Sequence, residues 1–153
     1  MKCCTFLGHH DGPDSLKVKI LAAIRAQVEA GTTSFYVGNQ GHFDRMALSC
    51  LRKMKKEYPD LTYAVVLAYL PTEPDWYEPD ETVLPEGIET VPKRFAIDFR
   101  NRWMIDHADT VIAYVTHSWG GAAKHLKSAE NKGKTIINLA ELLKIISSCG
   151  NTG

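Results

Sequence analysis

The chain has 153 residues, enough for one domain whose core needs no disulfide or metal ion. Hydrophobic residues at 44% and charged residues at 24% are typical of a globular protein and exclude a disordered or collagen-like chain. Eighteen basic and eighteen acidic residues cancel, which removes the net field that draws proteins onto nucleic acid or an anionic membrane but leaves room for a local basic pocket.

The chain opens with a strand followed by a helix. Lys2 to Leu7 is a short apolar run that predicts a buried strand, and the turn-forming stretch from Gly8 to Asp14 follows it. Asp14 or Ser15 can cap the next helix, which Gly31 ends. Its apolar face is formed by Leu16, Ile20, Ala23, Ile24, Gln27 and Val28.

The same pattern repeats along the next segment. Thr33 to Val37 predicts a second strand, Gly38 to Gly41 a turn, and a helix then runs to about Pro59. The face of that helix is formed by Phe43, Met46, Ala47, Cys50, Leu51 and Met54. Thr62 to Tyr69 is nearly all apolar, which favours a third strand in a parallel sheet covered on both faces.

The segment from Leu70 to Lys93 is rich in proline and acid and has no sustained period. A loop of this length is uncommon unless it works as a lid or binding loop, and Glu86 and Glu89 fit a short helix within it. The elements expected after it are a helix (Phe95–His107), a strand (Thr110–Val115), a helix (Gly121–Asn131), a strand (Thr135–Leu139) and a terminal helix (Ala140–Ser148).

This order of elements predicts an α/β fold: a Rossmann-like, doubly wound, mostly parallel sheet of about five strands with helices on both faces. We expect a single domain over residues 1–153. Apolar runs such as Ala64 to Leu70 fall far short of the ~20 residues that span a bilayer, and no charged-then-apolar leader is present, so the expected compartment is the cytoplasm, with no membrane partner.

Neither a metal site nor a cofactor is predicted. The histidines show no HExxH spacing, and the cysteines form no CxxC pair, so buried free thiols are the expected state. The cysteines are Cys3, Cys4, Cys50 and Cys149.

In an open α/β sheet, ligands lie outside the carboxyl ends of the strands, where loops and helix N-termini converge. Gly38 to Gly41 stands between a strand and a helix, where backbone N–H groups can approach a phosphate. Glycine also serves such turns for backbone reasons alone. Asp44, just inside the helix, either holds a ribose hydroxyl or complements the helix N-terminus.

Thr116 to Gly121 has the same placement and brings hydroxyls, an imidazole, an indole and a glycine pair to the start of a helix. It predicts a second phosphate or sugar cradle, the alternative being a Ser118 cap with Trp119 packed on the sheet edge. On the preceding helix, Arg100 is the candidate for a bidentate fork to phosphate or carboxylate, or else a solvated side chain covering apolar neighbours.

We therefore expect the main-chain amides around Asn39 and Ser118 to converge on a common hollow that can hold an anion. The candidate ligand-binding residues are Gly8, His9, His10, Gly38, Asn39, Gln40, Gly41, Asp44, Arg100, Asn101, Thr116, His117, Ser118, Trp119, Gly120 and Gly121.

In their joint order, four segments resemble the SLOG superfamily, the Rossmann-like group that includes the SMF/DprA and LOG proteins, and most closely its YpsA-like branch. The segments are Cys4–His9, Phe35–Asp44, Arg100–Met104 and Thr116–Ala123, and they extend over nearly the whole chain. The resemblance implies a Rossmann-like sheet whose glycine-rich turns bind a nucleotide or nucleotide-derived ligand, and frequent homodimers.

Among these relatives, LOG enzymes cleave the N-glycosidic bond of nucleoside monophosphates with an Arg on the helix and a Glu after a PGGxGT turn. Arg100 is the candidate for that Arg, whereas the Glu position holds Ala123, Lys124 or His125. Glycoside cleavage needs a carboxylate beside the sugar and an acid for the leaving base, roles that Asp44 or Glu86 would have to fill.

Three functions follow as hypotheses from this resemblance. The first is a sensor or sequestering module for a small, phosphate-bearing, nucleotide-derived ligand. The second is a LOG-like nucleotide N-glycosidase with Arg100, Asp44 and Glu86 as catalytic residues. The third is the single-stranded DNA binding of DprA-type relatives, which the zero net charge disfavours.

Overall fold

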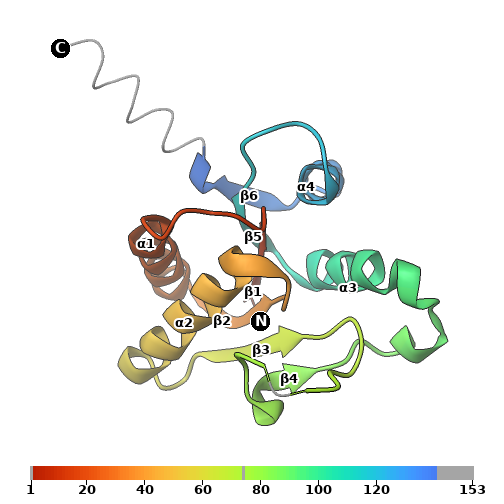
Figure 1. Cartoon of the computed structure of the whole chain (residues 1–153). Helices are drawn as coiled ribbons and strands as arrows, with labels where there is room; N and C mark the ends of the chain where they lie inside the picture. Colours follow the sequence, from red (N-terminus) through yellow and green to blue (C-terminus); the bar gives the residue numbers. More distant parts are fainter. Residues whose placement is uncertain (1, 74, 141–153) are drawn as a thin grey trace.

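The computed structural model describes residues 2–73 and 75–140, a parallel sheet with helices on both sides (Figure 1). The strands are β1 (Lys2–Gly8), β2 (Thr32–Val37), β3 (Thr62–Val66), β4 (Thr82–Val83), β5 (Thr110–Tyr114) and β6 (Thr135–Asn138). The helices are α1 (Leu16–Glu29), α2 (Gly41–Glu57), α3 (Lys93–His107) and α4 (Gly121–Asn131), with two short 3-10 helices, η1 (Pro79–Glu81) and η2 (Ile88–Thr90).

Every neighbouring pair of strands runs parallel, in the order β4-β3-β2-β1-β5-β6. The chain builds outward from β1 to β4 and then returns to the other side of β1 to add β5 and β6. The strand order therefore reverses between β1 and β5, and in open sheets of this kind ligands bind outside the carboxyl ends of the strands at that reversal. The predicted α/β, Rossmann-like, doubly wound sheet is confirmed, with six strands in place of about five.

Helices cover both faces of the sheet, α1 and α2 on one side and α3 and α4 on the other (Figure 1). Successive side chains of a strand point to opposite faces, so β1 contributes to two cores. Phe6 packs in the larger core with residues of α1 and α2, whereas Leu7 packs in the smaller core with residues of α3 and α4.

The third strand ends earlier than its sequence predicts, at Val66 instead of Tyr69. Leu67 and Ala68 are buried although they lie beyond the end of the strand, so the apolar stretch of sequence is longer than the strand itself. The additional strand, β4, is two residues long and pairs with β3, too short for any alternation of apolar residues to reveal it.

The helix boundaries agree with the predicted ones to within two residues at the N-termini of α1, α2, α3 and α4, and one of the two residues predicted to cap α1 is found at its N-cap. Ser15 occupies the N-cap position, and its side chain makes no capping hydrogen bond. The carboxylate of Asp14 instead contacts the imidazole of His42 at the start of α2. The terminal helix predicted over 140–148 lies outside the described residues apart from its first residue.

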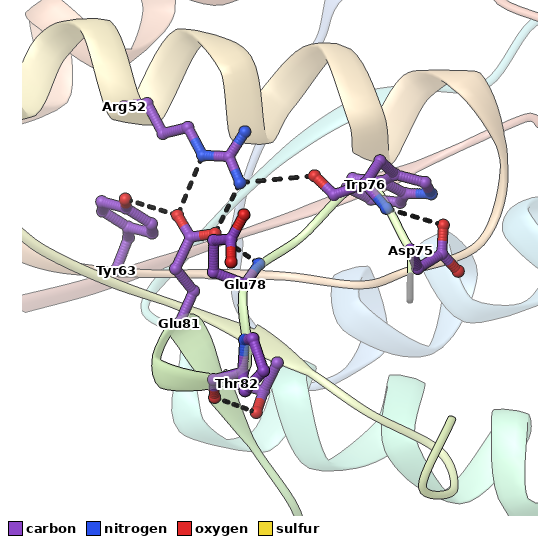
Figure 2. Close-up of polar contacts among 8 residues, drawn as sticks. Arg52, Tyr63, Asp75, Trp76, Glu78, Glu81 and Thr82 are labelled. Carbon is purple, nitrogen blue, oxygen red and sulfur yellow. Dashed lines mark hydrogen bonds and ion pairs between the residues drawn. The ribbon is translucent and has the colours of Figure 1, made fainter. Parts of the chain in front are cut away.

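The acidic, proline-rich segment is anchored to the sheet and to α2 by Glu81 (Figure 2). Arg52 of α2 donates from Nε and Nη2 to the two oxygens of this carboxylate, at 2.9 and 2.5 Å. The hydroxyl of Tyr63 on β3 donates to it at 2.7 Å, and the backbone N–H of Glu78 donates at 2.9 Å. Together these donors lower the pKa of Glu81 to about 2, with the Arg52 hydrogen bond as the largest cause.

The same segment reaches the carboxyl edge of the sheet through Tyr77. This side chain is buried in the larger core, and its hydroxyl accepts a hydrogen bond of 3.4 Å from the Nδ2 atom of Asn39. Residues 70–93 therefore contain η1, β4 and η2 and support the turn after β2. Of the two glutamates predicted to share a short helix, Glu89 lies in η2 and Glu86 lies before it.

Candidate functional site

A cavity of about 570 Å³ lies at the carboxyl ends of the strands, where the segments following β1, β2 and β5 meet α3. Its position matches the reversal of strand order between β1 and β5. Its lining residues are Phe6, Leu7, Gly8, His9, His10, Asp11, Gln40, Asp44, Ile97, Asp98, Arg100, Asn101, Met104, His117, Gly120, Gly121 and Ala122.

Most of the predicted ligand-binding residues line this cavity. Gln40 comes from the turn after β2, and Gly120 and Gly121 from the turn after β5, so the two turns approach one hollow. The predicted residues in the lining are Gly8, His9, His10, Gln40, Asp44, Arg100, Asn101, His117, Gly120 and Gly121. Those outside it are Gly38, Asn39, Gly41, Thr116, Ser118, Trp119 and Glu86.

Arg100 projects from α3 into the carboxyl edge of the sheet and is 1% exposed. Its Nη1 atom donates to Asn39 Oδ1 at 2.7 Å and to the Val66 carbonyl at 3.2 Å, and its Nε atom donates to Asn101 Oδ1 at 2.9 Å. Burial lowers the pKa of this guanidinium, an effect that Asp44 opposes. The alternative of a solvated arginine is therefore wrong, because α3 turns this side chain inward.

The second terminal nitrogen of Arg100, Nη2, remains for a ligand. Within the described part of the chain, no hydrogen bond engages Nη2, and no fully buried side-chain nitrogen or oxygen lacks a partner. Arg100 is one of the residues that line the cavity. A guanidinium fixed on two sides with one free N–H pair is well prepared to donate to an anionic oxygen.

Asp44 lies next to Arg100 and is 8% exposed. Burial raises the pKa of its carboxyl to about 6, against the opposing effects of the Arg100 guanidinium and of the Gln40 backbone N–H, which donates to Oδ2 at 2.9 Å. The bond to Gln40 satisfies a donor at the start of α2, as expected for a carboxylate that complements a helix N-terminus.

The glycines of the turn after β2 make room for these groups. A Cβ atom on Gly38 would lie 2.8 Å from Asp44 Oδ2 and 3.2 Å from Arg100 Cζ. Gly41 has φ +84°, and a Cβ there would lie 2.8 Å from the His10 Cα. Both glycines thus serve close packing, and the Gln40 amide is already used within the protein.

The N-terminus of α4 offers backbone donors for which residues 2–73 and 75–140 supply no such acceptor. Gly120, with φ +91°, occupies the N-cap position, and Gly121 and Ala122 in the first turn line the cavity. The first N–H groups of a helix have no intrahelical acceptor and favour an anion. Ser118 is not the cap, so that alternative interpretation of this turn is wrong, and Trp119 is exposed instead of packed on the sheet edge.

Asp98 is a carboxylate in the cavity that was not predicted from the sequence. It lies on α3, two residues before Arg100, and its Oδ1 atom accepts a hydrogen bond of 3.0 Å from Nε2 of His125 on α4. His125 is 3% exposed, and its hydrogen bond is the largest cause that lowers the pKa of Asp98. His125 is also one of the three residues considered at the missing Glu position, and here it holds a carboxylate supplied by another helix.

The other unforeseen lining residues are Phe6, Leu7, Asp11, Ile97, Met104 and Ala122. Helical spacing could have found two of them, because Ile97 and Met104 stand three residues before and four after Arg100 on α3. Glu86 is exposed, lies between β4 and η2, and is not brought to the cavity.

Three aromatic rings from the segments after β1 and β5 stack beside the cavity: His9, His117 and Trp119. The backbone N–H of Thr116 donates to His9 Nε2 at 3.0 Å, which fixes the proton of this neutral imidazole on Nδ1. Burial lowers the pKa of His9, and the neighbouring His117 lowers it further.

Cys3, Cys4 and Cys50 are buried free thiols as predicted, and Cys149 lies outside the described residues. Among residues 2–73 and 75–140, no three His, Cys, Asp or Glu side chains are grouped as a metal ion requires. No helix in that same part of the chain is long and apolar enough to cross a membrane.

A family model named YpsA, described as the YspA SLOG family, matches residues 1–140. A UPF0398 protein of Bacillus cereus strain B4264 is 25% identical over 141 residues, covering 84% of this chain and 77% of that protein. A UPF0398 protein of Bacillus thuringiensis strain Al Hakam is 24% identical over 144 residues, covering 87% and 78%. A probable mandelate racemase structure from Alicyclobacillus acidocaldarius, 14% identical with a TM-score of 0.29, covers 88% of this chain and 41% of that one, a similarity too low to inform fold or function.

Proposed function

Because the chain belongs to the YspA SLOG family, we propose that its cavity binds a small nucleotide-derived ligand that carries a phosphate, and that the protein senses or sequesters this ligand. Membership of a SLOG family indicates a nucleotide-related function on a Rossmann-like fold. The resemblance of the sequence to the YpsA-like branch is thereby confirmed. Beyond family membership, the proposal states which kind of ligand binds and that the protein senses or sequesters it.

The observation that carries the proposal is the meeting of a free guanidinium edge and a free helix N-terminus in one cavity. Arg100 Nη2 and the first-turn amides of Gly121 and Ala122 all belong to groups in the cavity lining. Arginine and the first N–H groups of a helix are both well suited to donate to a phosphate. We assign the phosphate to the space between them.

The sugar is assigned to Asp98. Its hydrogen bond to His125 keeps the carboxylate ionised and fixed, with its remaining lone pairs free for hydroxyl donors. Vicinal hydroxyls of a ribose are donors of the kind that such a carboxylate binds. Asn101, held against the Arg100 Nε atom, lies beside it in the same lining.

Calorimetry with a panel of nucleoside mono- and diphosphates, NAD and ADP-ribose tests the binding function. We expect at least one compound to bind, and Arg100→Gln to weaken it at least tenfold. Arg94→Gln is the matched control, because Arg94 is an exposed arginine on the same helix and is not in the cavity lining. No binding of any compound at millimolar concentration by the folded protein would reject the proposal.

A second function, nucleotide N-glycosidase, is favoured by one further observation. Asp98 and Asp44 line the same cavity, and their environments push their pKa values in opposite directions, as in enzymes that use one carboxylate and one carboxylic acid. In this version the bond between the sugar and the base breaks as Asp44 protonates the leaving base and Asp98 stabilises the sugar cation. Water then adds to the cation and returns a proton to Asp44, while Glu86 has no part. Release of free base from nucleoside monophosphates, lost in Asp98→Asn, is the expected result; intact substrate after long incubation would reject it.

A further inference from the structure

The stacked rings beside the cavity form a ladder, which we define as His9, His117 and Trp119. The ring centroids of His9 and His117 lie 3.9 Å apart with an interplanar angle of 17°, and those of His117 and Trp119 have the same separation and angle. His9 also meets the Tyr114 ring edge-on at 6.1 Å. The ladder thus begins against β5 and ends at the indole.

Backbone contacts hold the ladder in place. The Nδ1 atom of His117 donates to the carbonyl oxygen of Trp119 at 2.9 Å, and His9 Nε2 accepts the N–H of Thr116 at 3.0 Å. Gly120, with φ +91°, then turns the chain directly into α4. Rings fixed in this way lose little further conformational freedom when something stacks on them.

The inner part of the ladder belongs to the cavity, and the outer part does not. His9 and His117 are in the lining, together with Gly120, whereas Trp119 is not in the lining and is 69% exposed. One face of the indole is covered by His117, so the exposed surface is its opposite face and its edges. An indole held with one face bare presents a surface on which another ring can stack in an offset arrangement.

We propose that the outer face of Trp119 stacks on the base of a nucleotide whose phosphate and sugar lie in the cavity. This inference rests on the proposed binding function and adds the part of the ligand that the indole recognises, its heteroaromatic base. Such a base extends the ladder by one more ring, because every base has a π-face suited to an indole. The segment between β5 and α4 carries His117 and Trp119 of the ladder and leads into the N-terminus of α4, so in this proposal one turn contacts both ends of the nucleotide.

The test compares AMP with ribose 5-phosphate, which carries the same phosphate and sugar without the base. We expect AMP to bind the wild-type protein about 5- to 150-fold more tightly than ribose 5-phosphate, the range that one stacked base contributes. Trp119→Ala should remove most of that difference by weakening AMP alone. Trp119→Phe, which retains an aromatic face, should keep most of it.

Trp103 provides a matched control. It also stacks on a histidine, His107, with centroids 4.0 Å apart at 25°, but it is not in the cavity lining. Trp103→Phe should therefore leave the affinities of both compounds unchanged. In a Trp76→Phe, Trp103→Phe background, Trp119 is the remaining tryptophan, and its fluorescence should be quenched by AMP and not by ribose 5-phosphate.

Four outcomes are distinguishable. Loss of AMP affinity in Trp119→Ala with ribose 5-phosphate unchanged supports the inference. Equal affinities of the two compounds for the wild-type protein overturn it while leaving the binding function intact. An equal loss for both compounds in Trp119→Ala also overturns it, since the indole would then only support the turn. Binding of neither compound, by a protein that binds nothing else in the panel, rejects the proposed function itself.

Discussion

Asp44→Asn should change how the stability of the protein depends on pH. The carboxyl of Asp44 has an ordinary pKa of 3.8, and burial raises it to about 6 in the folded protein. The folded state therefore binds more protons than the unfolded state between these two values. The free energy of unfolding rises as the pH falls through 6, and the substitution removes this rise.

The expected magnitude follows from the two pKa values. At pH 5 the folded carboxyl is about nine-tenths protonated, while the unfolded one is almost fully ionised. Between pH 8 and pH 5, Asp44 therefore adds about 1.4 kcal/mol to the stability of the wild-type protein. The amide introduced by Asp44→Asn cannot titrate, so the stability of the wild type relative to this variant should increase by that amount over the same interval.

Urea unfolding followed by circular dichroism at pH 8 and pH 5 measures the difference. The substitution also removes the negative charge beside Arg100 and changes the bond to Gln40, and both effects contribute at either pH. The change, between pH 8 and pH 5, in the stability difference between wild type and variant therefore reports the titration of Asp44. Asp98→Asn is the control, because the pKa of Asp98 is lowered and its titration lies below pH 5. The same stability difference between wild type and Asp44→Asn at both pH values would refute this account of the site.

Three further predictions follow from other contacts. Gly38→Ala places a Cβ against the buried carboxylate and guanidinium and should cost about 1–3 kcal/mol in urea unfolding, whereas Gly121→Ala, with no atom within 4 Å of its Cβ, should cost little. Glu81→Gln breaks the bidentate contact with Arg52 and should cost about 1 kcal/mol at pH 7; because the pKa of Glu81 is lowered to about 2, that loss should shrink as the pH falls below 4.5 toward 2. His9 should titrate below 6.5 by NMR, because burial and then the neighbouring His117 lower its pKa, and the stability that its neutral form contributes should be lost as the pH falls.

The sequence was sufficient to predict the sheet and most of its helices because their apolar residues recur at the spacing of strands and helices. It could not predict β4, whose two residues carry no such pattern and which forms because η1 is held by Arg52 and Tyr63. The sequence also could not predict that β3 ends at Val66. The apolar residues that follow Val66 are buried in the core although they are not part of the strand.

For the candidate site, the order of strands, glycines and helices in the sequence predicted where the turns lie. It did not predict which way their side chains point. Arg100 was selected by residue type, yet its burial depends on Asn39 and the Val66 carbonyl, which are distant in sequence. Asp98 was missed because its role depends on His125, a partner 27 residues away on another helix. The stacking of His9 on His117 likewise joins two loops that only the parallel pairing of β1 with β5 brings together.

The segment that carries Tyr77 supports the position of Arg100 from outside the cavity. Glu81 clamps the segment to α2 and β3, Tyr77 contacts Asn39, and Asn39 receives the Arg100 guanidinium. A sequence change near residue 77 should therefore move the Arg100 guanidinium, and alter the anion affinity that we propose for it, without any contact with the ligand. Selection acting on this segment has a route to adjust that proposed affinity while the residues in the cavity stay the same.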